Sequence, residues 1–598
     1  MLSLAGFAIA AAAVFATAAV VGAIYPARRA ITAIRSRTLD INTLMVVAVV
    51  GALLLGEWLE AAAVVCLFAV AQWLELRTME RARQAIRALI DLSPREALVR
   101  RDGVDSRVLV ENIHVGDEIL VRPGDKIPLD GTVVGGYSDV NEAPLTGESL
   151  PMDKGPGDEV FAGSINGRGA LDIAVTRMVR DTRLAQIIHL VEMAQASRAP
   201  IQSFVDRFAR VYTPAVLVFA VLVALVPPLV GGADPIVWLY RALVLLVISC
   251  PCALVISTPV SIVSALSAAA RNGVLVKGGV HLERLAGIHV VAFDKTGTLT
   301  KGELTVADVL TFNGASGFDV LRYAAAVEAR SEHPVARAIV SHARDQRVDV
   351  PPAARFVSVP GLGAEAEVGG VPVSVGNERL LHARGIQVPP LPELDRAREQ
   401  GHSVVLVSVK GVVAGAISLA DHPRDTAREA IELVREQGVR RVAMLTGDHE
   451  ETAAVVAEAL GLDEYHAGLM PDQKHERIRA LNRQYGAVLM VGDGINDAPA
   501  IAAAHVGIAM GAAGSDVALE TADVALMSDE LLRVPYAIRL ARATLRNVRM
   551  NVAISLALKA AFLVMAVFGM ATLWMAVLAD TGASVIVVGN ALRLLRAR

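Results

Sequence analysis

Cysteine is scarce in this chain of 598 residues, which has only three. Cys66, Cys250 and Cys252 all lie in apolar stretches, and a single proline separates the last two. Cysteines so few and so placed argue against the disulfide framework on which small secreted domains depend. Two roles remain open for these thiols, which are inert packing and metal binding.

The chain also lacks strong net charge and the best-known nucleotide-binding motif. Its formal net charge is −4, which gives no sign of a nucleic-acid partner. No Gly-rich loop leads into Gly-Lys-Ser or Gly-Lys-Thr, so the P-loop class of enzymes is excluded. The first apolar run has no basic segment before it and is about 25 residues long, which favours a membrane helix over a signal peptide.

Apolar residues, in contrast, are plentiful. They make up 54% of the chain, the mean hydropathy is +0.48, and 20% of the residues are charged. This is too apolar for a soluble protein and too charged for one that lies wholly in lipid. Seven apolar runs fall in three clusters, at residues 2–25, 41–56 and 61–74, at 211–230 and 236–270, and at 552–568 and 571–588. The sequence therefore predicts a multi-pass membrane protein with two large polar inserts.

Arginines that follow several of these runs indicate how the chain is oriented. Arg28 and Arg29 follow the first run, Arg77 follows the third, and Arg593 and Arg596 follow the last. Positively charged residues collect on the cytosolic side of a membrane, so both polar inserts are expected in the cytosol.

The two inserts have different patterns. The first alternates short apolar strands with turn residues, which predicts a small β-rich domain. The second alternates strands with amphipathic helices, and "VVAFDKTGTL", "RRVAMLTGD" and "AVLMVGDGIND" each carry an acidic, glycine-containing loop after the strand. That pattern predicts a doubly wound parallel sheet with its site at the carboxyl ends of the strands. The predicted divisions are membrane helices at 1–85, the β-rich domain at 86–207, membrane helices at 208–270, the α/β domain at 271–303 and 420–545, an α+β domain inserted at 304–419, and membrane helices at 546–598.

The loop "DKTGTLT" carries the first candidate for chemistry. Asp294 follows an apolar strand, where its carboxylate can attack a phosphorus atom, and the amides around Thr296 can bind phosphate oxygens. On its own the same stretch also fits a surface Asp-Lys turn. Companion motifs offer further groups for phosphate and Mg²⁺, namely Thr446, Gly447 and Asp448 in "MLTGD", Lys474 in "PDQK", and Asp493 and Asp497 in "GDGIND".

These motifs resemble those of the P-type ATPases, and the resemblance extends over nearly the whole chain. In that family the aspartate of "DKTGTLT" is transiently phosphorylated by ATP, which implies that Asp294 is the phosphorylated residue. The resemblance also implies that Asp493 is the main protein ligand of Mg²⁺ and that Asp497 supports it. The predicted fold is then a helical membrane bundle with a β-rich actuator domain, a phosphorylation domain of the haloacid-dehalogenase type and an inserted nucleotide-binding domain.

Two further motifs fit the same family. "LTGES" resembles its actuator loop, here Thr146, Gly147 and Glu148, and Glu148 would position the water that hydrolyses the aspartyl phosphate. The inserted domain would bind ATP, and its "SEHP" resembles a signature of the heavy-metal branch. Glycines in this domain would let the backbone approach the nucleotide closely. The implied pocket residues are Glu328, His333, Gly361, Gly363 and Asn377.

The proline between Cys250 and Cys252 is the main clue to a cargo. On a regular helix, residues two apart point about 200° apart, but a proline that opens the helix lets both sulfurs turn toward one ion. Thiolates select soft or borderline ions such as Zn²⁺, Cd²⁺, Pb²⁺ or Cu⁺. A kinked helix with two inert cysteines is the alternative, yet in the heavy-metal ATPases "CPC" in this helix marks the transport site.

Two charged residues in the last apolar runs bear on the choice of metal. Lys559 and Asp580 are costly at such depth, so they are expected to pair or to serve a path. Asp580 adds a hard oxygen to two thiolates, which favours a divalent ion over Cu⁺, and Lys559 would be its counter-charge once the metal has left. Snorkelling by Lys559 or helix capping by Asp580 is the alternative. The tail "ADTGASVIVVGNALRLLR" resembles the zinc, cadmium and lead exporters of the branch.

Glu60 lies at the outer turn between the second and third runs. It would receive metal on the way out, or else form part of a solvated hairpin. Members of the branch commonly have a further membrane helix and a Cys-x-x-Cys metal-binding domain ahead of the part seen here, and we expect this chain to lack both.

We therefore expect an exporter in a bacterial plasma membrane, surrounded by lipid, that uses ATP and Mg²⁺ to move Zn²⁺, Cd²⁺ or Pb²⁺ out of the cytosol. A cytosolic metal donor such as a thiol ligand is a candidate partner. The alternatives are a Cu⁺ exporter of the same family, a non-transporting membrane metal sensor and a phosphatase tethered to the membrane.

Overall fold

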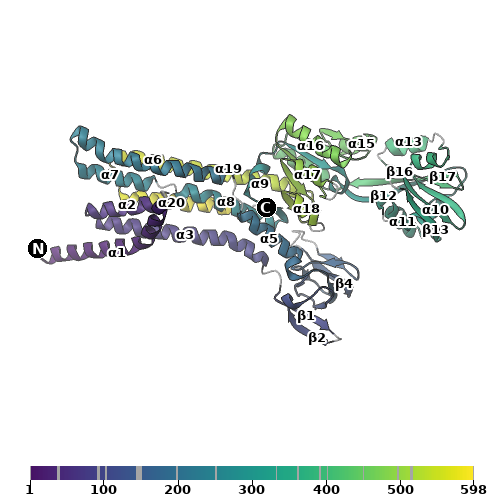
Figure 1. Cartoon of the computed structure of the whole chain (residues 1–598), viewed down its shortest axis with the longest axis horizontal. Coiled ribbons are helices and arrows are strands. Elements are labelled where there is room, and N and C mark those ends of the chain that lie inside the picture. The colour runs from purple at the N-terminus through teal and green to yellow at the C-terminus, as the bar shows by residue number, and fades with distance from the viewer. Residues whose placement is uncertain are drawn as a thin grey trace. The chain divides into compact units, whose positions relative to one another are not determined.

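The computed structural model has two compact units, one formed by Met1–Ala286 with Arg539–Arg598 and the other by Gly287–Ile538. It describes residues 2–36, 41–90, 94–101, 104–142, 151–196, 200–249, 252–331, 333–359, 362–388, 392–399, 402–448, 450–494, 497–511 and 516–596. The first unit contains long helices and a β-rich domain, and the second contains two sheets with their helices (Figure 1).

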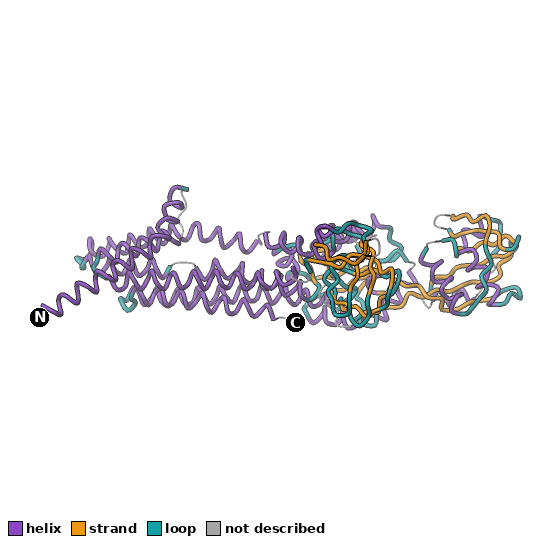
Figure 2. Tube along the Cα trace, turned by 90° about the horizontal axis from the view of Figure 1, so that it is seen from below, coloured by secondary structure: helices purple, strands orange, loops and turns teal. Residues whose placement is uncertain are grey.

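Apolar helices make up most of the first unit. They are α1 (Leu2–Arg35), α2 (Ile41–Leu54), α3 (Trp58–Ile90), α6 (Pro200–Gly231), α7 (Pro235–Ile248), α8 (Cys252–Arg271), α19 (Arg533–Val567) and α20 (Leu573–Leu592). Within the described residues, five stretches are long and apolar enough to cross a membrane, and two shorter apolar helices cover Asn42–Leu54 and Trp58–Trp73. These helices match the apolar runs of the sequence, and Figure 2 shows them side by side.

The membrane helices pack through small and aliphatic side chains. Gly51 on α2 lies so close to α7 that a Cβ there would be 2.6 Å from the Leu243 side chain. Small residues allow such approach, and van der Waals contact is what holds helices together where lipid is as apolar as the protein. Leu44, Val65 and Ala576 bring α2, α3 and α20 into the same buried cluster.

The Cys-Pro-Cys stretch lies between two described helices. α7 ends at Ile248 with Ser249 as its C-cap, and α8 begins at Cys252. Local unwinding at the proline stays a prediction, because residues 250 and 251 lie outside the described part of the chain.

The first polar insert is a β-rich domain, which confirms the prediction. Its larger sheet has the order β2-β1-β3-β9-β4-β7, formed by β1 (Glu96–Arg101), β2 (Val104–Leu109), β3 (Glu118–Val121), β4 (Gly131–Gly135), β7 (Glu159–Val160) and β9 (Leu171–Val175). A smaller sheet joins β5 (Ser138–Asn141) to β6 (Met152–Lys154) and β8 (Ile165–Asn166). Alternate residues point inward, so Val99, Ile119 and Ile173 are fully buried. Helix α5 (Arg183–Ala196) follows the last strand.

The second unit is built on a parallel sheet. Its strands run in the order β22 (Val524–Leu526), β21 (Val506–Ala509), β20 (Val488–Gly492), β11 (Val290–Asp294), β18 (Arg441–Leu445) and β19 (Glu464–His466). Every residue of β11 and β20 is buried, as expected of parallel strands covered on both faces. The connecting helices include α14 (Ala427–Glu436), α15 (Glu450–Leu460), α16 (Pro471–Tyr485), α17 (Ala498–Ala503) and α18 (Asp516–Thr521). The register pairs Asp294 with Leu445, so the carboxyl ends of β11 and β18 meet at one edge.

An antiparallel domain interrupts this sheet between β11 and β18. Its sheet has the order β12 (Thr300–Thr311), β17 (Val412–Pro423), β16 (Ser403–Val409), β15 (Val371–Gly376), β14 (Gly363–Val368) and β13 (Ala353–Val359). The helices α10 (Gly317–Glu328) and α11 (Pro334–Asp345) pack their apolar faces against it, and two short helices, α12 (Glu378–Ala383) and α13 (Pro392–Glu399), follow β15. The strands β12 and β17 pair along most of their length, and through them the chain leaves and rejoins the parallel-sheet domain.

Candidate functional site

Asp294 lies at the centre of the candidate site in the second unit. It is the last residue of β11, and only 4% of its surface is exposed. The chain turns sharply after it, and Gly297 has a φ of +75°, a conformation that glycine adopts at little cost. A Cβ on Gly297 would be 3.7 Å from Oδ2 of Asp493, so the two motifs face each other.

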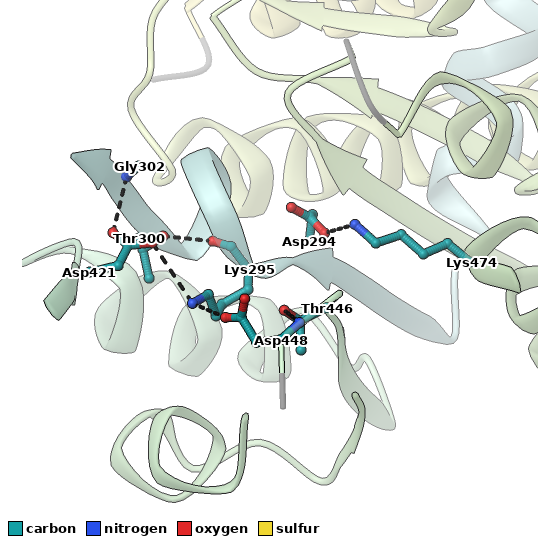
Figure 3. Close-up of polar contacts among 8 residues, drawn as sticks. All are labelled: Asp294, Lys295, Thr300, Gly302, Asp421, Thr446, Asp448 and Lys474. Carbon is teal, nitrogen blue, oxygen red and sulfur yellow. Dashed lines mark hydrogen bonds and ion pairs between the residues drawn. The ribbon is translucent and has the colours of Figure 1, made fainter. Parts of the chain in front are cut away.

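Lys474 lies directly across from Asp294 (Figure 3). Its Nζ is 2.5 Å from Oδ1 of Asp294 and 2.7 Å from Oδ1 of Asp497. The lysine is in the first turn of α16, and Asp497 immediately precedes α17, so two helix starts bring these groups to the end of the central strand. All three side chains are buried.

Burial and neighbouring charges set the protonation states of Asp294 and Lys474. Burial raises the pKa of Asp294 to about 7, and the nearby Asp497 adds to the rise while Lys474 opposes it. Burial by itself lowers the pKa of Lys474, but the carboxylates of Asp294 and Asp497 outweigh that effect and raise it. Lys474 is therefore a fixed cation at neutral pH.

A second set of contacts fixes the loop after Asp294 (Figure 3). Lys295 forms an ion pair with Asp448, and its Nζ is 3.9 Å from Oδ2 of Asp421. Asp421 also accepts hydrogen bonds from the Thr300 hydroxyl at 2.6 Å and from the Gly302 amide at 3.2 Å. The strand β17, returning from the inserted domain, thus holds the loop in place.

Arg424 completes this support from just beyond β17. Its Nε donates to the carbonyl of Thr298 at 3.0 Å, and its guanidinium donates to the carbonyl of Gly297 at 3.0 Å. Sequence reasoning missed both Asp421 and Arg424. The signal was the acid-bearing "ADHPRD" at the end of an apolar strand, the same pattern that singled out the other loops.

The remaining predicted phosphate ligands lie around the same edge. Thr446 is buried, and its hydroxyl accepts a hydrogen bond from the Asp448 amide at 3.1 Å. Gly447 and Thr296 are exposed, so their backbone groups can be reached from solvent. The structure therefore brings together the predicted residues from the loops after β11 and β18 with those from α16 and the loop after β20.

The carboxylates at this edge suit Mg²⁺. Asp493 and Asp497 follow β20 and offer hard oxygen atoms beside Asp294. Among the described residues, no three His, Cys, Asp or Glu side chains are grouped so as to enclose a metal ion. Mg²⁺ takes one or two carboxylates and completes its shell with water and substrate phosphate.

In the inserted domain, the predicted nucleotide residues stand at the starts of helices and at one strand pair. His333 caps α11, accepting a hydrogen bond from the Val335 amide, and Asn377 caps α12. Gly363 pairs with Gly376, and a Cβ on Gly363 would be 2.2 Å from the carbonyl of Val375, so only glycine fits there.

Glu328 lies at the end of α10 and is 6% exposed. Burial raises its pKa, and a hydrogen bond to the Ser331 side chain opposes the rise. Glu328 and Ser331 line a cavity of about 280 Å³ together with Arg337 and Arg344 of α11. An acid and two arginines at one cavity suit a polar ligand with an anionic part.

In the first unit, Lys559 and Asp580 form an ion pair between membrane helices. Nζ of Lys559 on α19 is 3.1 Å from Oδ1 of Asp580 on α20 and donates to the carbonyl of Ile248 at 3.1 Å. Ile248 is the last residue of α7, so the lysine links the ion pair to the end of that helix. The next residue, Ser249, forms a hydrogen bond with the side chain of Tyr212 on α6.

A buried asparagine network lies further along the same helices. Asn551 on α19 donates to Asn547 and to the carbonyl of Val587, and Asn590 on α20 donates to Asn551 at 2.8 Å. Asn547 in turn accepts a hydrogen bond from the Ser261 hydroxyl of α8 at 3.1 Å. Sequence reasoning missed this network, although its signal was present, since residues 547, 551, 555 and 559 are polar at intervals of four.

Several predicted residues lie outside the described part of the chain. They are the actuator-loop residues Thr146, Gly147 and Glu148, together with Gly361 and Cys250. The backbone of Cys252 starts α8, but its side chain is not described. Glu60 is described, and its carboxylate accepts a hydrogen bond from Tyr240 at 2.7 Å.

Taken together, these features define a class of protein. A buried aspartate ends the central strand of a parallel sheet and faces a lysine and further carboxylates. The same chain carries a β-rich domain and a bundle of apolar helices with an ion pair between two of them. This is the architecture of a membrane-bound phosphoryl-transfer enzyme.

Comparisons with known proteins give the family. Residues 288–505 match the haloacid dehalogenase-like hydrolase family, and residues 91–192 match the P-type ATPase actuator domain. The cadmium-transporting ATPase of Staphylococcus aureus is 44% identical over 565 residues, which cover 94% of this chain and 78% of that protein. The zinc/cadmium/lead-transporting P-type ATPase of Escherichia coli (strain K12) is 45% identical over 583 residues, which cover 96% of this chain and 78% of that protein.

A solved structure agrees with these relatives. The crystal structure of a zinc-transporting PIB-type ATPase in its E2.Pi state is 42% identical, has a TM-score of 0.63, and aligns over 98% of this chain and 95% of that chain. The chain belongs to the P-type ATPases, in the heavy-metal-transporting branch, and is an integral membrane protein. The predicted family and fold class are confirmed, and the roles of individual site residues stay predictions.

Proposed function

We propose that this ATPase exports divalent soft metal ions, Zn²⁺ together with Cd²⁺ and Pb²⁺, from the cytosol of a bacterium across its plasma membrane. The relatives above are named as cadmium and zinc/cadmium/lead transporters. The single observation that carries the proposal on this chain is the Lys559–Asp580 ion pair, whose lysine also contacts the end of α7, two residues before Cys250 in the sequence. The pair provides a hard oxygen, and a charge to balance it, close in the chain to the Cys-Pro-Cys stretch.

The chemical half of the cycle is assigned to the second unit. Asp294 attacks the γ-phosphorus of ATP as a carboxylate, the bond to the β–γ bridging oxygen breaks, and ADP leaves as the aspartyl phosphate forms. Lys474 stabilises the negative charge that develops on the transferred group. The amides around Thr296 and Gly447 bind its oxygens. Mg²⁺ held by Asp493 and Asp497 neutralises phosphate charge when it is bound. The buried Glu328 and the capping residues His333 and Asn377 are proposed to bind the nucleotide.

The return half of the cycle is assigned to the actuator loop. Glu148, with Thr146 and Gly147 beside it, is proposed to position the water that hydrolyses the phosphorylated Asp294. Coupling to transport requires that metal affinity differ between the inward-open and outward-open states, and phosphorylation would select between them.

The membrane half of the cycle is assigned to Cys250, Cys252 and Asp580. Two thiolates and a carboxylate carry three negative charges, which a divalent ion and Lys559 balance. When the ion leaves, Lys559 pairs with Asp580, so the acid is never left as an isolated charge between helices. A site for one monovalent Cu⁺ would not need this acid.

A cavity of about 230 Å³ supports delivery from the cytosolic side. Asp580 and Ser584 line it on α20, Asn42 and Gln72 line it on α2 and α3, and Arg29 lines it on α1. The cavity has room for a metal ion with a small ligand. The positive charge of Arg29 favours a metal that arrives bound to an anionic donor such as a thiol.

The proposal is tested by ATPase turnover of the purified protein with Zn²⁺, Cd²⁺, Pb²⁺ and Cu⁺ in turn. Stimulation by the divalent ions is expected, and it should vanish both in Asp294→Asn and in the double variant Cys250→Ala/Cys252→Ala. Stimulation by Cu⁺ alone would overturn the cargo and keep the family. Folded protein that binds ATP and responds to no metal would overturn export itself.

A further inference from the structure

Tyr240 joins three membrane helices close to the turn between α2 and α3. Its hydroxyl donates to Oε2 of Glu60 at 2.7 Å and accepts the backbone N–H of Leu573 at 3.3 Å. Glu60 is in the first turn of α3, Tyr240 in the middle of α7, and Leu573 is the first residue of α20. The helix α20 packs against both α3 and α7.

This arrangement fixes the direction of the Glu60 carboxylate. A tyrosine hydroxyl has one proton to donate, and here that proton goes to Glu60. The N–H of Leu573 is one of the amides at a helix start that have no partner within their own helix, and it fixes the hydroxyl from the other side. The Glu60 side chain is half-buried and Leu573 is buried, so water competes little with these two hydrogen bonds.

The same helices reach the proposed cargo site. Asp580 lies seven residues after Leu573 on α20, which is about two helical turns. Ile248, whose carbonyl binds Lys559, lies eight residues after Tyr240 on α7. A shift of α20 or α7 as Asp580 gains or loses metal therefore moves one of the two groups that orient Glu60.

We propose that Tyr240 is a positioning residue for metal release, which holds the Glu60 carboxylate in one direction at the start of α3 and ties that direction to α20. This inference rests on the proposed export function and on Glu60 as the first acceptor of the leaving ion. Without the hydroxyl, Glu60 is free to turn to bulk water, and the ion meets no oriented ligand on its way out. Uptake from the cytosol is unaffected, because Cys250, Cys252 and Asp580 are unchanged.

The test is Tyr240→Phe, which removes the hydroxyl and keeps the ring. In protein reconstituted in vesicles, Zn²⁺-stimulated kcat should fall about tenfold, as expected for a lost hydrogen bond to a charged group. The KM for Zn²⁺, added on the side of the membrane where ATP is supplied, should change by less than about twofold. Appearance of Zn²⁺ on the opposite side, followed with a trapped zinc-sensitive dye, should slow by the same factor as kcat. Tyr25→Phe makes the same chemical change on the exposed face of α1 and should leave both values unchanged.

A double-mutant cycle separates positioning of Glu60 from a plain structural tie between helices. Glu60→Gln should itself lower kcat, and adding Tyr240→Phe to it should cause no further loss. Normal kcat in Tyr240→Phe, or an equal loss with and without Glu60, would overturn the proposal. Zn²⁺ transport by the wild-type protein in the same vesicles tests the export function itself. The ratio of variant to wild-type kcat tests the role of Tyr240. A failure of the proposed export function can therefore be told apart from a failure of the proposal for Tyr240.

Discussion

Two lysines, Lys474 buried and Lys559 largely buried, occupy the centres of two sites in very different surroundings. Lys474, at the edge of the parallel sheet, lies 2.5 Å from Asp294 and 2.7 Å from Asp497. Lys559, between membrane helices, lies 3.1 Å from Asp580 and 3.1 Å from a backbone carbonyl. In both sites the ammonium group stands against the carboxylate that the proposed cycle uses.

The two sites differ in how charge is balanced. Lys474 faces two carboxylates, and Asp493 follows the neighbouring strand, so the site keeps negative charge that a divalent cation can neutralise. Among the described residues Lys559 forms an ion pair with one carboxylate, that of Asp580, and this pair has no net charge. An excess charge among membrane helices is costly, whereas the excess negative charge at the edge of the sheet can be neutralised by a bound cation. The surroundings thus set how many charges each lysine must balance.

The sheet site should respond most strongly to loss of its lysine. Lys474→Met leaves Asp294 and Asp497 facing each other and removes the cation that stabilises the transferred group. We expect formation of the phosphoenzyme from ATP to slow by about 10³-fold. Rapid-quench measurement of protein-bound phosphate checks this. Lys301→Met is the matched control, because Lys301 is half-exposed and pairs only with the exposed Asp425 among the described residues. A loss of less than about tenfold would contradict a role for Lys474 in the transition state.

The membrane site should show the reverse behaviour, in which removing both charges is milder than removing one. Lys559→Met or Asp580→Asn alone leaves one buried charge uncompensated and should destabilise the first unit by about 3 kcal/mol. The double variant Lys559→Met/Asp580→Asn should recover most of that stability while remaining inactive in transport. Thermal unfolding in detergent of the four proteins measures this. A double variant no more stable than either single variant would show that the pair is not held by charge balance.

The comparison also shows what the sequence could and could not predict. Asp294, Thr446 and Asp493 were found because each follows an apolar strand, and parallel strands bring such ends together. Lys474 was found as a point charge in "PDQK", which lies in the chain between two of those strands. The parallel pairing of β11 with β18 and β20 then places the ends of these strands at one edge of the sheet.

Asp421 and Arg424 were missed for a physical reason. They act on a loop more than a hundred residues earlier, and the long pairing of β12 with β17 is what brings them there. Local patterns do not reveal such long-range pairing. The polar residues at every fourth position of α19 include the asparagines of the network, but only the structure shows their partners on α8 and α20. The actuator loop and Cys250 remain sequence predictions, because they lie outside the described residues.

The charge of Asp294 itself should make the second unit sensitive to pH. Burial raises its pKa from an ordinary value of 3.8 to about 7, so the folded chain binds a proton that the unfolded chain has released between these values. Ionised Asp294 therefore costs stability above about pH 7, and the cost disappears as pH falls toward 4. Asp294→Asn should raise the unfolding temperature at about pH 8, with a gain that shrinks through pH 7 and vanishes near pH 4. Scans at matched rates across this range check it, and a gain independent of pH would contradict the raised pKa.

The asparagine network should show the smallest effect, because neutral hydrogen bonds between membrane helices are individually weak. Asn551→Leu removes the donor to Asn547 and Val587 and the acceptor for Asn590. We expect a loss of about 1 kcal/mol, less than for either charge variant of the ion pair, since no charge is left unpaired. Ser555→Ala, one turn further along α19, is the matched control, because among the described residues that buried hydroxyl has no hydrogen-bond partner. Detergent unfolding of both variants measures the difference. A loss as large as that of Lys559→Met would mean that these amides, and not the ion pair, determine how α8, α19 and α20 are held together.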